Sequence, residues 1–506
     1  MTVDNIYNRK KSRRNIFFLG IGMMLASVLA IYFFYDSGFA TIVLAIITPL
    51  YFLFTYRFPT LIVYALLFYS FAIFFVSRYL LRDIFPAGTI YDVMLILGYL
   101  AVWMAKGNKK RVEWERIKDA PFWILLGWLA YCMFSIVLPE FPGFNAWMLS
   151  FRVHFYMAFS IPLFILLLDA KSIKTIIVLW AVFSIIISLK GIVQLYNFNT
   201  GGGIPGLSLA DQGFLQGNKF HILGGKLRVF SFLSDAGQFG VQQAHAATTG
   251  LLLLLSAKNG KQRLLYIILA LAGLYGLFVS GTRGAVFVLF GGAFAYCFWI
   301  RKIKLLILAI VLAGGFYGFM SYTYIGNNVY AIHRMRTAFK PDQDASYIAR
   351  KINQETLKVY LASRPFGGGL GSMQHGHEGT VLKDTPFDSG YVLVWGDQGI
   401  VGLCLYIGMI IFFLLKGTYV LWFQIKNEWL RSILIAMMSG LAGVAVANYG
   451  NPVMVQHPTC VMYFLIVAVI YAAPRIDKSL QPQEETVAPK PTSVSTRLTK
   501  FRVTTI

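Results

Sequence analysis

The chain has 506 residues, of which 57% are apolar, 16% are aromatic and only 13% are charged. Together with a mean hydropathy of +0.63, this composition excludes a water-soluble globular protein. Its formal charge of +23 is expected to come largely from basic loops that bind anionic lipid, so no nucleic-acid partner is needed. We therefore predict an all-α, polytopic helical membrane protein in contact with membrane lipid.

The apolar runs recur from about residue 15 to residue 473. Stretches of roughly 20 apolar residues predict about fourteen transmembrane helices. The first run follows a basic arm and is expected to be a retained helix rather than a cleaved signal peptide. The predicted spans lie near 15–35, 38–56, 60–80, 88–105, 120–138, 152–169, 174–196, 239–256, 263–280, 284–300, 303–321, 392–415, 431–448 and 457–473.

These spans divide the chain into five segments. A basic cytoplasmic arm at 1–14 precedes helices 1 to 11 at 15–321, which include a Gly-rich periplasmic loop near 197–238. A long periplasmic loop follows at 322–390, and helices 12 to 14 occupy 391–473. The tail at 474–506 is rich in Pro, Thr, Ser, Lys and Glu and is expected to be a disordered cytoplasmic extension.

The basic residues of the short loops set the predicted orientation, because Lys and Arg are retained on the cytoplasmic side. With fourteen spans the basic clusters all fall on one face, so both termini are predicted to be cytoplasmic. Arg78 and Arg82 are the main exception. The clusters are the N-terminal arm, Lys106 to Lys118, Lys171 with Lys174, Lys258 to Arg263, Arg301 to Lys304, Lys416 to Arg431, and Arg475 with Lys478.

Three arginines, Arg152, Arg228 and Arg283, lie beside or between apolar runs, and the same count places all three on the outer side. An arginine at a bilayer edge is energetically costly unless it meets an anion, and its planar guanidinium suits the oxygens of a phosphate or diphosphate. We interpret the three as candidate diphosphate ligands. Interfacial snorkelling or a structural ion pair is the alternative for each, and it weighs most for Arg152.

The long outer loop contains a segment with apolar residues at helical spacing among charges. This pattern predicts an amphipathic helix from Ala345 to Ser363, which we expect to cover the site as a lid. Arg364 and Pro365 end it, and the glycine turn Phe366-Gly367-Gly368-Gly369-Leu370-Gly371 follows. Such a turn lets the backbone approach a ligand or another helix closely, although simple chain reversal explains it equally well.

The order of several short motifs resembles the O-antigen ligase and O-antigen polymerase superfamily of bacterial inner-membrane glycosyltransferases. The motifs are Arg228-Val229-Phe230-Ser231-Phe232-Leu233-Ser234-Asp235, Ser280-Gly281-Thr282-Arg283-Gly284-Ala285, Arg350, Arg364 to Gly371, and Asp397-Gln398-Gly399-Ile400-Val401-Gly402-Leu403. The resemblance implies an inverting, metal-independent transfer of a glycan from undecaprenyl diphosphate to an acceptor hydroxyl at the periplasmic face, without a cofactor. The implied acceptor is a lipid A-core sugar, the next glycan repeat unit, or a protein Ser or Thr.

The resemblance also implies roles for individual residues. Arg228 and Arg283 are the first choice for stabilising the diphosphate leaving group, and Arg152 and Arg350 are further candidate ligands. The family's usual general base is a histidine just before the Gly-Ile-Val-Gly motif, where this chain has Asp388. That departure favours a polymerase or a divergent lineage over a ligase.

Two loop histidines, His375 and His377, are alternatives to Asp388 as the base, because imidazole titrates near neutral pH. These two with Glu378 lack a fourth ligand at helical spacing, so no metal site is predicted. Lys190 and His245 lie within predicted spans, where ionisable groups usually face a polar interior.

The alternative from another functional class is a transporter or flippase for a lipid-linked oligosaccharide or polysaccharide. Such a protein would share the many spans and basic inner loops, but it should have repeated halves with broken helices at matching places. No such internal match is found in the sequence. A one-sided loop with its own helix also favours the enzyme.

Overall fold

The computed structural model describes residues 38–81, 86–105, 112–218, 221–327, 332, 336, 339 and 345–481. The predicted arm at 1–14, the first predicted span and the part of the tail beyond 481 lie outside the described residues. Within them the chain is all-α apart from one short hairpin, in which β1 (Ile222–Leu223) pairs antiparallel with β2 (Lys226–Leu227).

Thirteen of the fourteen predicted spans coincide with long helices of the described chain. Eight helices are long and apolar enough to cross a membrane, and three shorter apolar helices accompany them, so the chain is a multi-pass membrane protein. The total of fourteen stays a prediction. The long helices are α2 (Gly38–Arg57), α3 (Leu61–Phe75) with the π-helix η1 (Val76–Leu80), α4 (Gly88–Met104), α5 (Phe122–Phe134), α6 (Phe144–Leu167), α7 (Ala170–Thr200), α9 (Ala236–Leu254), α10 (Gly260–Val279), α11 (Val286–Trp299), α12 (Ile303–Tyr322), α17 (Gly390–Phe423), α18 (Glu428–Ala447) and α19 (Thr459–Leu480).

Short elements connect these helices, most of them at one end of the bundle. They are the 3-10 turns η3 (Trp114–Asp119), η4 (Ser135–Val137), η5 (Ile204–Gly206), η7 (Arg283–Ala285) and η9 (Val453–Val455), and the helices α8 (Leu209–Gly217), α14 (Ala345–Leu361), α15 (Ser372–His375) and α16 (Val381–Asp384). The predicted amphipathic helix is therefore present as α14 and ends before Arg364 and Pro365.

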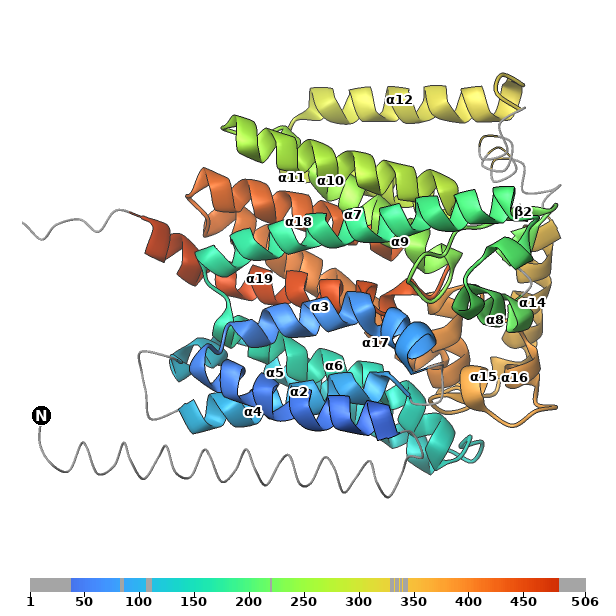
Figure 1. The fold of residues 1–506 in the computed structure, drawn as a ribbon, viewed down its shortest axis with the longest axis horizontal. Helices are drawn as coiled ribbons and strands as arrows, with labels where there is room; N and C mark the ends of the chain where they lie inside the picture. The colour runs from blue at the N-terminus through green and yellow to red at the C-terminus, as the bar shows by residue number, and fades with distance from the viewer. Residues whose placement is uncertain are drawn as a thin grey trace, which may run out of the picture.

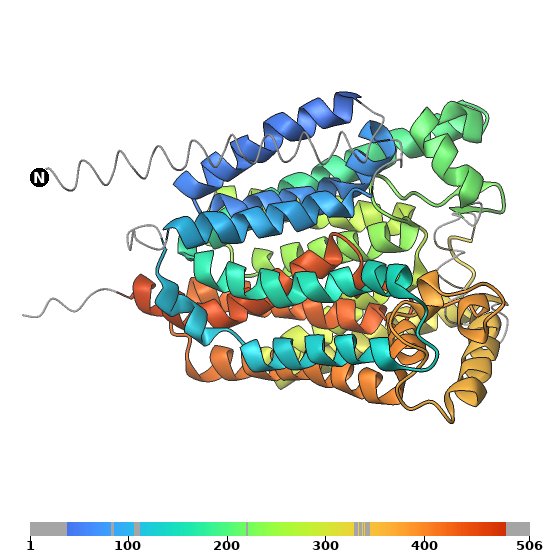
Figure 2. The same ribbon diagram turned by 90° about the horizontal axis from the view of Figure 1, so that it is seen from below.

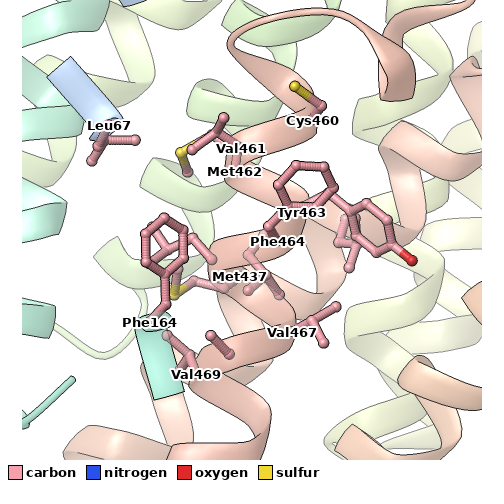
Figure 3. Close-up of a cluster of buried hydrophobic side chains, with 14 of the residues drawn as sticks. Leu67, Phe164, Met437, Cys460, Val461, Met462, Tyr463, Phe464, Val467 and Val469 are labelled. Atoms are coloured by element: carbon pink, nitrogen blue, oxygen red, sulfur yellow. The ribbon is translucent and has the colours of Figure 1, made fainter. Parts of the chain in front are cut away.

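Helix α19 forms the centre of the bundle, and α12 lies at its edge (Figure 1). In the most apolar stretch of α19, 89% of the residues are buried, whereas only 6% are buried in the corresponding stretch of α12. Apolar side chains of α19, among them Met462 and Phe464, lie in one buried cluster with Leu67 of α3, Phe164 of α6 and Met437 of α18 (Figure 3). Side chains that are apolar all round a helix, as in α19, can be satisfied only in such a central position.

The bundle has two chemically different ends. The hairpin, α8, α14, α15 and α16 gather at one end, and the C-terminal end of α19 lies at the other (Figures 1 and 2). Basic loops meet at that second end, where Lys258 Nζ lies 3.0 Å from Glu428 Oε2 and Asp477 Oδ1 accepts from Asn427 N at 2.7 Å. Which end faces the cytoplasm stays a prediction.

Two helix boundaries differ from the sequence prediction. Helix α6 begins at Phe144 rather than 152, because its first turns bury Ala146 and Trp147 although their sequence is only partly apolar. Helix α19 continues past Pro474 to Leu480, where the disordered tail was expected to have begun. Arg475 donates a hydrogen bond to Leu168 O, just after α6, at 3.0 Å. This contact holds the end of α19 in place.

The Gly-rich loop near 197–238 is a folded unit and is attached to the bundle by buried charges. Lys190 of α7 pairs with Asp211 of α8 at 2.7 Å, and Tyr79 donates to the same carboxylate at 2.7 Å. Arg78 is buried, donates to Ser234 O at 2.9 Å and lies 3.8 Å above the Phe214 ring. Arg78 was an exception to the predicted cytoplasmic placement of basic residues. Its contacts with Ser234 and Phe214 give it a structural role instead, because they hold this loop against the bundle.

Candidate functional site

Arg228 and Arg283 come from different segments and meet through one threonine. Arg228 follows the hairpin, whose turn residues Gly224 and Gly225 both have positive φ. Its guanidinium Nη2 donates to Thr282 Oγ1 at 3.3 Å, and Thr282 directly precedes Arg283 at the start of η7. The Thr282 hydroxyl itself donates to Ala236 O at 2.8 Å. The two arginines that were first choice as diphosphate ligands are therefore neighbours at one end of the bundle.

Arg350 and Asp388 form an ion pair beside this pair of arginines. Arg350 Nε lies 3.2 Å from Asp388 Oδ2, and Arg350 Nη2 donates to Gly450 O at 3.4 Å. Gly450 in turn abuts Gly284, since a β-carbon added to Gly284 would lie 3.8 Å from the Gly450 Cα. The loop after α18 thus brings Arg350 and Asp388 next to the residue that follows Arg283.

Asp388 is held at the N-terminus of α17. Ser389 is the N-cap residue, and its hydroxyl accepts from the backbone N–H groups of Tyr391 and Val392. Gly390 N donates to Asn448 O at 2.8 Å, which fixes this end of α17 against the end of α18. The side chain of Asp388 is 49% exposed, so it can reach a substrate.

The glycine turn packs against a kink in α17 rather than offering its backbone to a ligand. Gly399 interrupts α17 with φ 69°, and a β-carbon there would lie 2.0 Å from Pro365 O. Gly368 N donates to Gly396 O at 3.1 Å, which joins the two motifs backbone to backbone. The sequence left three interpretations of the turn open: close approach to a ligand, close approach to another helix, or simple chain reversal. At these positions the turn closely approaches another helix.

Asp397 anchors the same turn, although the sequence suggested no role for it. Its carboxylate is buried and accepts from Gly371 N at 3.0 Å and from Met373 N at 2.9 Å. A buried carboxylate that accepts two backbone N–H groups fixes the turn and begins α15. The Asp-Gln-Gly-Ile motif was the only sequence signal that pointed to Asp397. Its role could not be inferred from that motif, because the residues it binds lie 24 and 26 positions away.

Helix α14 is fastened across this end by contacts with the α5–α6 loop. Arg364 Nε lies 2.6 Å from Glu140 Oε1, and the Tyr360 hydroxyl also donates to the Glu140 carboxylate. Leu357 and Leu361 are buried against side chains of α15, α16 and α17. The helix therefore packs against the end of α17 that follows Asp388, and its role as a lid stays a prediction.

Arg152 is held in a different environment from the other arginines. Because α6 begins earlier than predicted, Arg152 lies two turns inside the helix, where its Nη2 is 2.5 Å from Asp92 Oδ2. This is the structural ion pair that was the alternative interpretation. Its role as a diphosphate ligand stays a prediction.

His375 and His377 are exposed, on the short segment that follows the glycine turn. Among the described residues, neither imidazole makes a hydrogen bond or ion pair with Asp388 or with the arginines. Local desolvation and the nearby Lys383 lower the pKa of His375, which weakens it as a base. His245 is buried and packs edge-on against Trp180 at 4.7 Å, away from this end.

His221 positions Arg228, and the sequence analysis missed it. His221 O accepts from Arg228 N at 2.8 Å, while His221 Nε2 accepts from Ala236 N at 3.2 Å. The side chain is fully buried, and burial lowers its pKa to about 4. A Gly-Gly pair between apolar residues is a hairpin signal, and it could have indicated that the residues around Arg228 are held by a turn.

The comparisons with known proteins agree with this geometry. Residues 267–407 match the family model described as O-Antigen ligase, which confirms the resemblance to the O-antigen ligase and polymerase superfamily. The matched segment contains Arg283, Arg350, Asp388 and Asp397, but neither Arg152 nor Arg228. The match supports an O-antigen ligase-like function in polysaccharide biosynthesis, and enzymes of this family are of the glycosyltransferase type. No curated protein matches the chain.

Proposed function

Because residues 267–407 carry the O-antigen ligase match, we propose that the chain is a glycosyltransferase that moves a glycan from undecaprenyl diphosphate to an acceptor hydroxyl at the periplasmic face of the inner membrane. The observation that carries the proposal is the meeting of Arg228, Arg283 and Arg350 with the carboxylate Asp388 at one end of an apolar bundle. Cations fixed near the leaving group can stabilise a departing diphosphate, and a carboxylate beside them can take the acceptor's proton.

The arginines act on the leaving group. As the bond between the sugar C1 and the diphosphate oxygen breaks, negative charge grows on the diphosphate, and guanidinium groups already in place stabilise it. Arg228 and Arg283 are held by the hairpin, Thr282 and η7, so little reorganisation is needed when the charge develops. Loss of one such cation costs on the order of 3 kcal/mol of barrier, or about a hundredfold in rate.

Asp388 acts on the acceptor. The acceptor oxygen forms the new bond to C1 while the bond to the diphosphate breaks, its proton passes to Asp388, and the electron pair leaves with undecaprenyl diphosphate. A single displacement of this kind inverts the configuration at C1 and needs no metal ion. In the present arrangement Asp388 is paired with Arg350, whose side chain is 32% exposed. Such an exposed pair is weak, at about 0 to 1 kcal/mol, so the more highly charged diphosphate can draw Arg350 away.

The decisive experiment uses the full chain purified in lipid nanodiscs with an undecaprenyl-diphosphate-linked glycan as donor. Release of undecaprenyl diphosphate together with formation of a glycosylated acceptor supports the proposal. Arg283→Ala should abolish transfer while the protein still inserts, whereas Arg263→Ala, at an exposed arginine of the α9–α10 end, should not. Retained transfer by Arg283→Ala would remove that residue from the mechanism. If the intact chain never cleaves the donor but moves it across the bilayer, the flippase alternative replaces the proposal.

The general base is tested by separate replacements. Asp388→Asn should lose far more activity than His375→Gln or His377→Gln, because only Asp388 lies beside the arginines. Envelope glycans of a deletion strain then separate the acceptor classes. Uncapped lipid A-core with long carrier-linked chains identifies a ligase, single repeat units a polymerase, and unmodified glycoproteins a protein O-glycan ligase.

A further inference from the structure

A small cavity lies beneath the glycine turn, between α6, α15, α17 and the loop that follows α18. Its volume is about 100 Å³. Most of its wall is apolar, and the neutral polar side chains on it are Ser150, His154, Gln374, Gln398 and Gln456. The carboxylate of Asp397 also borders the cavity, but both of its oxygens already accept backbone N–H groups of the turn. A wall of this kind suits neutral hydroxyl groups better than a phosphate.

His154 is oriented by one hydrogen bond. Trp128 Nε1 donates to His154 Nδ1 at 3.1 Å, and the two rings meet edge to face with centroids 5.4 Å apart. An indole N–H can only donate, so His154 Nδ1 must carry the lone pair. In the neutral ring the proton is then on Nε2. His154 can therefore offer a hydrogen-bond donor to an occupant of the cavity, but it cannot accept a proton there.

The cavity is close to the proposed reaction site. Val394 of α17 borders it, six residues after Asp388, which corresponds to about 9 Å along a helix. The loop after α18 also joins the two places, because its Gly450 carbonyl accepts from Arg350 while its Val455 and Gln456 line the cavity. A distance of this size is comparable to one or two sugar units.

We propose that this cavity is a subsite for one edge of a sugar ring, in which the glycan's hydroxyl groups bind His154 and the surrounding amides. The inference rests on the proposed function, because it assumes that a glycan reaches this end of the bundle. The cavity, at about 100 Å³, is small, and the hydroxyl groups at the edge of a ring are the part of a glycan that its polar side chains can bind. The Gln374 amide can donate and accept at the same time, as hydroxyl groups require, whereas Gln456 Oε1 already accepts from Ser234 Oγ at 2.9 Å and Gln398 Nε2 already donates to Cys132 Sγ at 3.8 Å.

Binding is measured without turnover, by saturation-transfer NMR of methyl glycosides added to the full chain in nanodiscs. We expect the wild-type protein to bind a methyl hexoside in the millimolar range. His154→Phe should weaken binding about tenfold, because it removes one hydrogen bond to the sugar, and His154→Gln should restore part of it. Val455→Phe should block the cavity, whereas the matched change Val137→Phe, at a valine that is 71% exposed, should have no effect.

Transfer kinetics provide the second measurement. His154→Phe and Val455→Phe should raise the KM for one glycan substrate about tenfold with a smaller change in kcat, since the subsite binds and does not react. If the wild-type protein transfers glycan but both variants bind methyl glycosides and show the same KM as wild type, the cavity holds only water and this inference is wrong while the proposed function stands. If no transfer occurs but the variants still lose glycoside binding, the cavity is a sugar site and the proposed reaction is wrong.

Discussion

Replacement of Asp397 by asparagine tests how the glycine turn is held. The buried carboxylate accepts from Gly371 N at 3.0 Å and from Met373 N at 2.9 Å. An asparagine amide has only one acceptor oxygen, so one of the two N–H groups would face an NH₂ group. Loss of one bond to a charged group costs about 1.5 to 3 kcal/mol, and the lower cost of burying a neutral amide offsets part of that. We expect the turn to be destabilised by about 1 to 2 kcal/mol.

Hydrogen exchange measured by mass spectrometry reads this change locally. If opening of the turn becomes easier by about 1 to 2 kcal/mol, amides of residues 366–376 should exchange roughly 5 to 30 times faster. The matched control is Asp384→Asn, because Asp384 is exposed and accepts a single backbone N–H, from Gly379 at 3.3 Å. That variant should exchange nearly as the wild type does. Unchanged exchange in Asp397→Asn would mean that glycine packing alone holds the turn.

Three further predictions concern the frame around the site. Gly399→Ala should prevent stable folding, because its β-carbon would lie 2.0 Å from Pro365 O, whereas Gly408→Ala in the same helix, with no atom within 4 Å, should raise the midpoint of thermal unfolding slightly. Lys190→Met should destabilise the protein by about 3 to 5 kcal/mol because it leaves Asp211 buried and unpaired, and adding Asp211→Leu should recover most of that loss in chemical denaturation. Burial lowers the pKa of His221 from its ordinary value of 6.5 to about 4. The free energy of unfolding is therefore highest above pH 6.5, and it falls by about 1.4 kcal/mol per pH unit as the pH drops toward 4, because the unfolded chain then binds the proton more tightly. Limited proteolysis of the 209–235 region should therefore speed up over that window in the wild type, and His221→Leu should abolish this pH dependence.

Features that depend on nearby residues could be predicted from the sequence. A helix that crosses a bilayer needs about 20 consecutive apolar residues, so its presence can be read from one segment. The same holds for α14, whose periodic apolar residues and terminal Arg364-Pro365 are all local. The grouping of Arg228 with Arg283 was also accessible, because counting spans places both at the same end.

Features that depend on distant partners could not be predicted. Arg152 resembled the other outer arginines in sequence, but its partner Asp92 lies 60 residues earlier and on another helix. Arg78 was an exception to the predicted charge pattern. Its hydrogen-bond acceptor, Ser234, is 156 residues away, so its structural role could not be read from the neighbouring sequence. A single sequence contains no signal for such pairings, since an ionisable residue in an apolar run has the same local pattern whether it binds a ligand or a neighbour.

The pairing of Arg350 with Asp388 bears on the order of events in the proposed reaction. While the pair is intact, Arg350 Nε contacts Asp388 Oδ2, one of the two oxygens that could take the acceptor's proton. A bound diphosphate competes for Arg350, and it is the stronger partner because it carries more charge and its oxygens suit the guanidinium fork. The donor would thus release Asp388 Oδ2 as it binds, so that both carboxylate oxygens are open when the leaving group is in place. Arg350→Ala should remove this dependence, and the rate of transfer should fall because one diphosphate contact is lost; equal rates in the variant and the wild type would refute that contact.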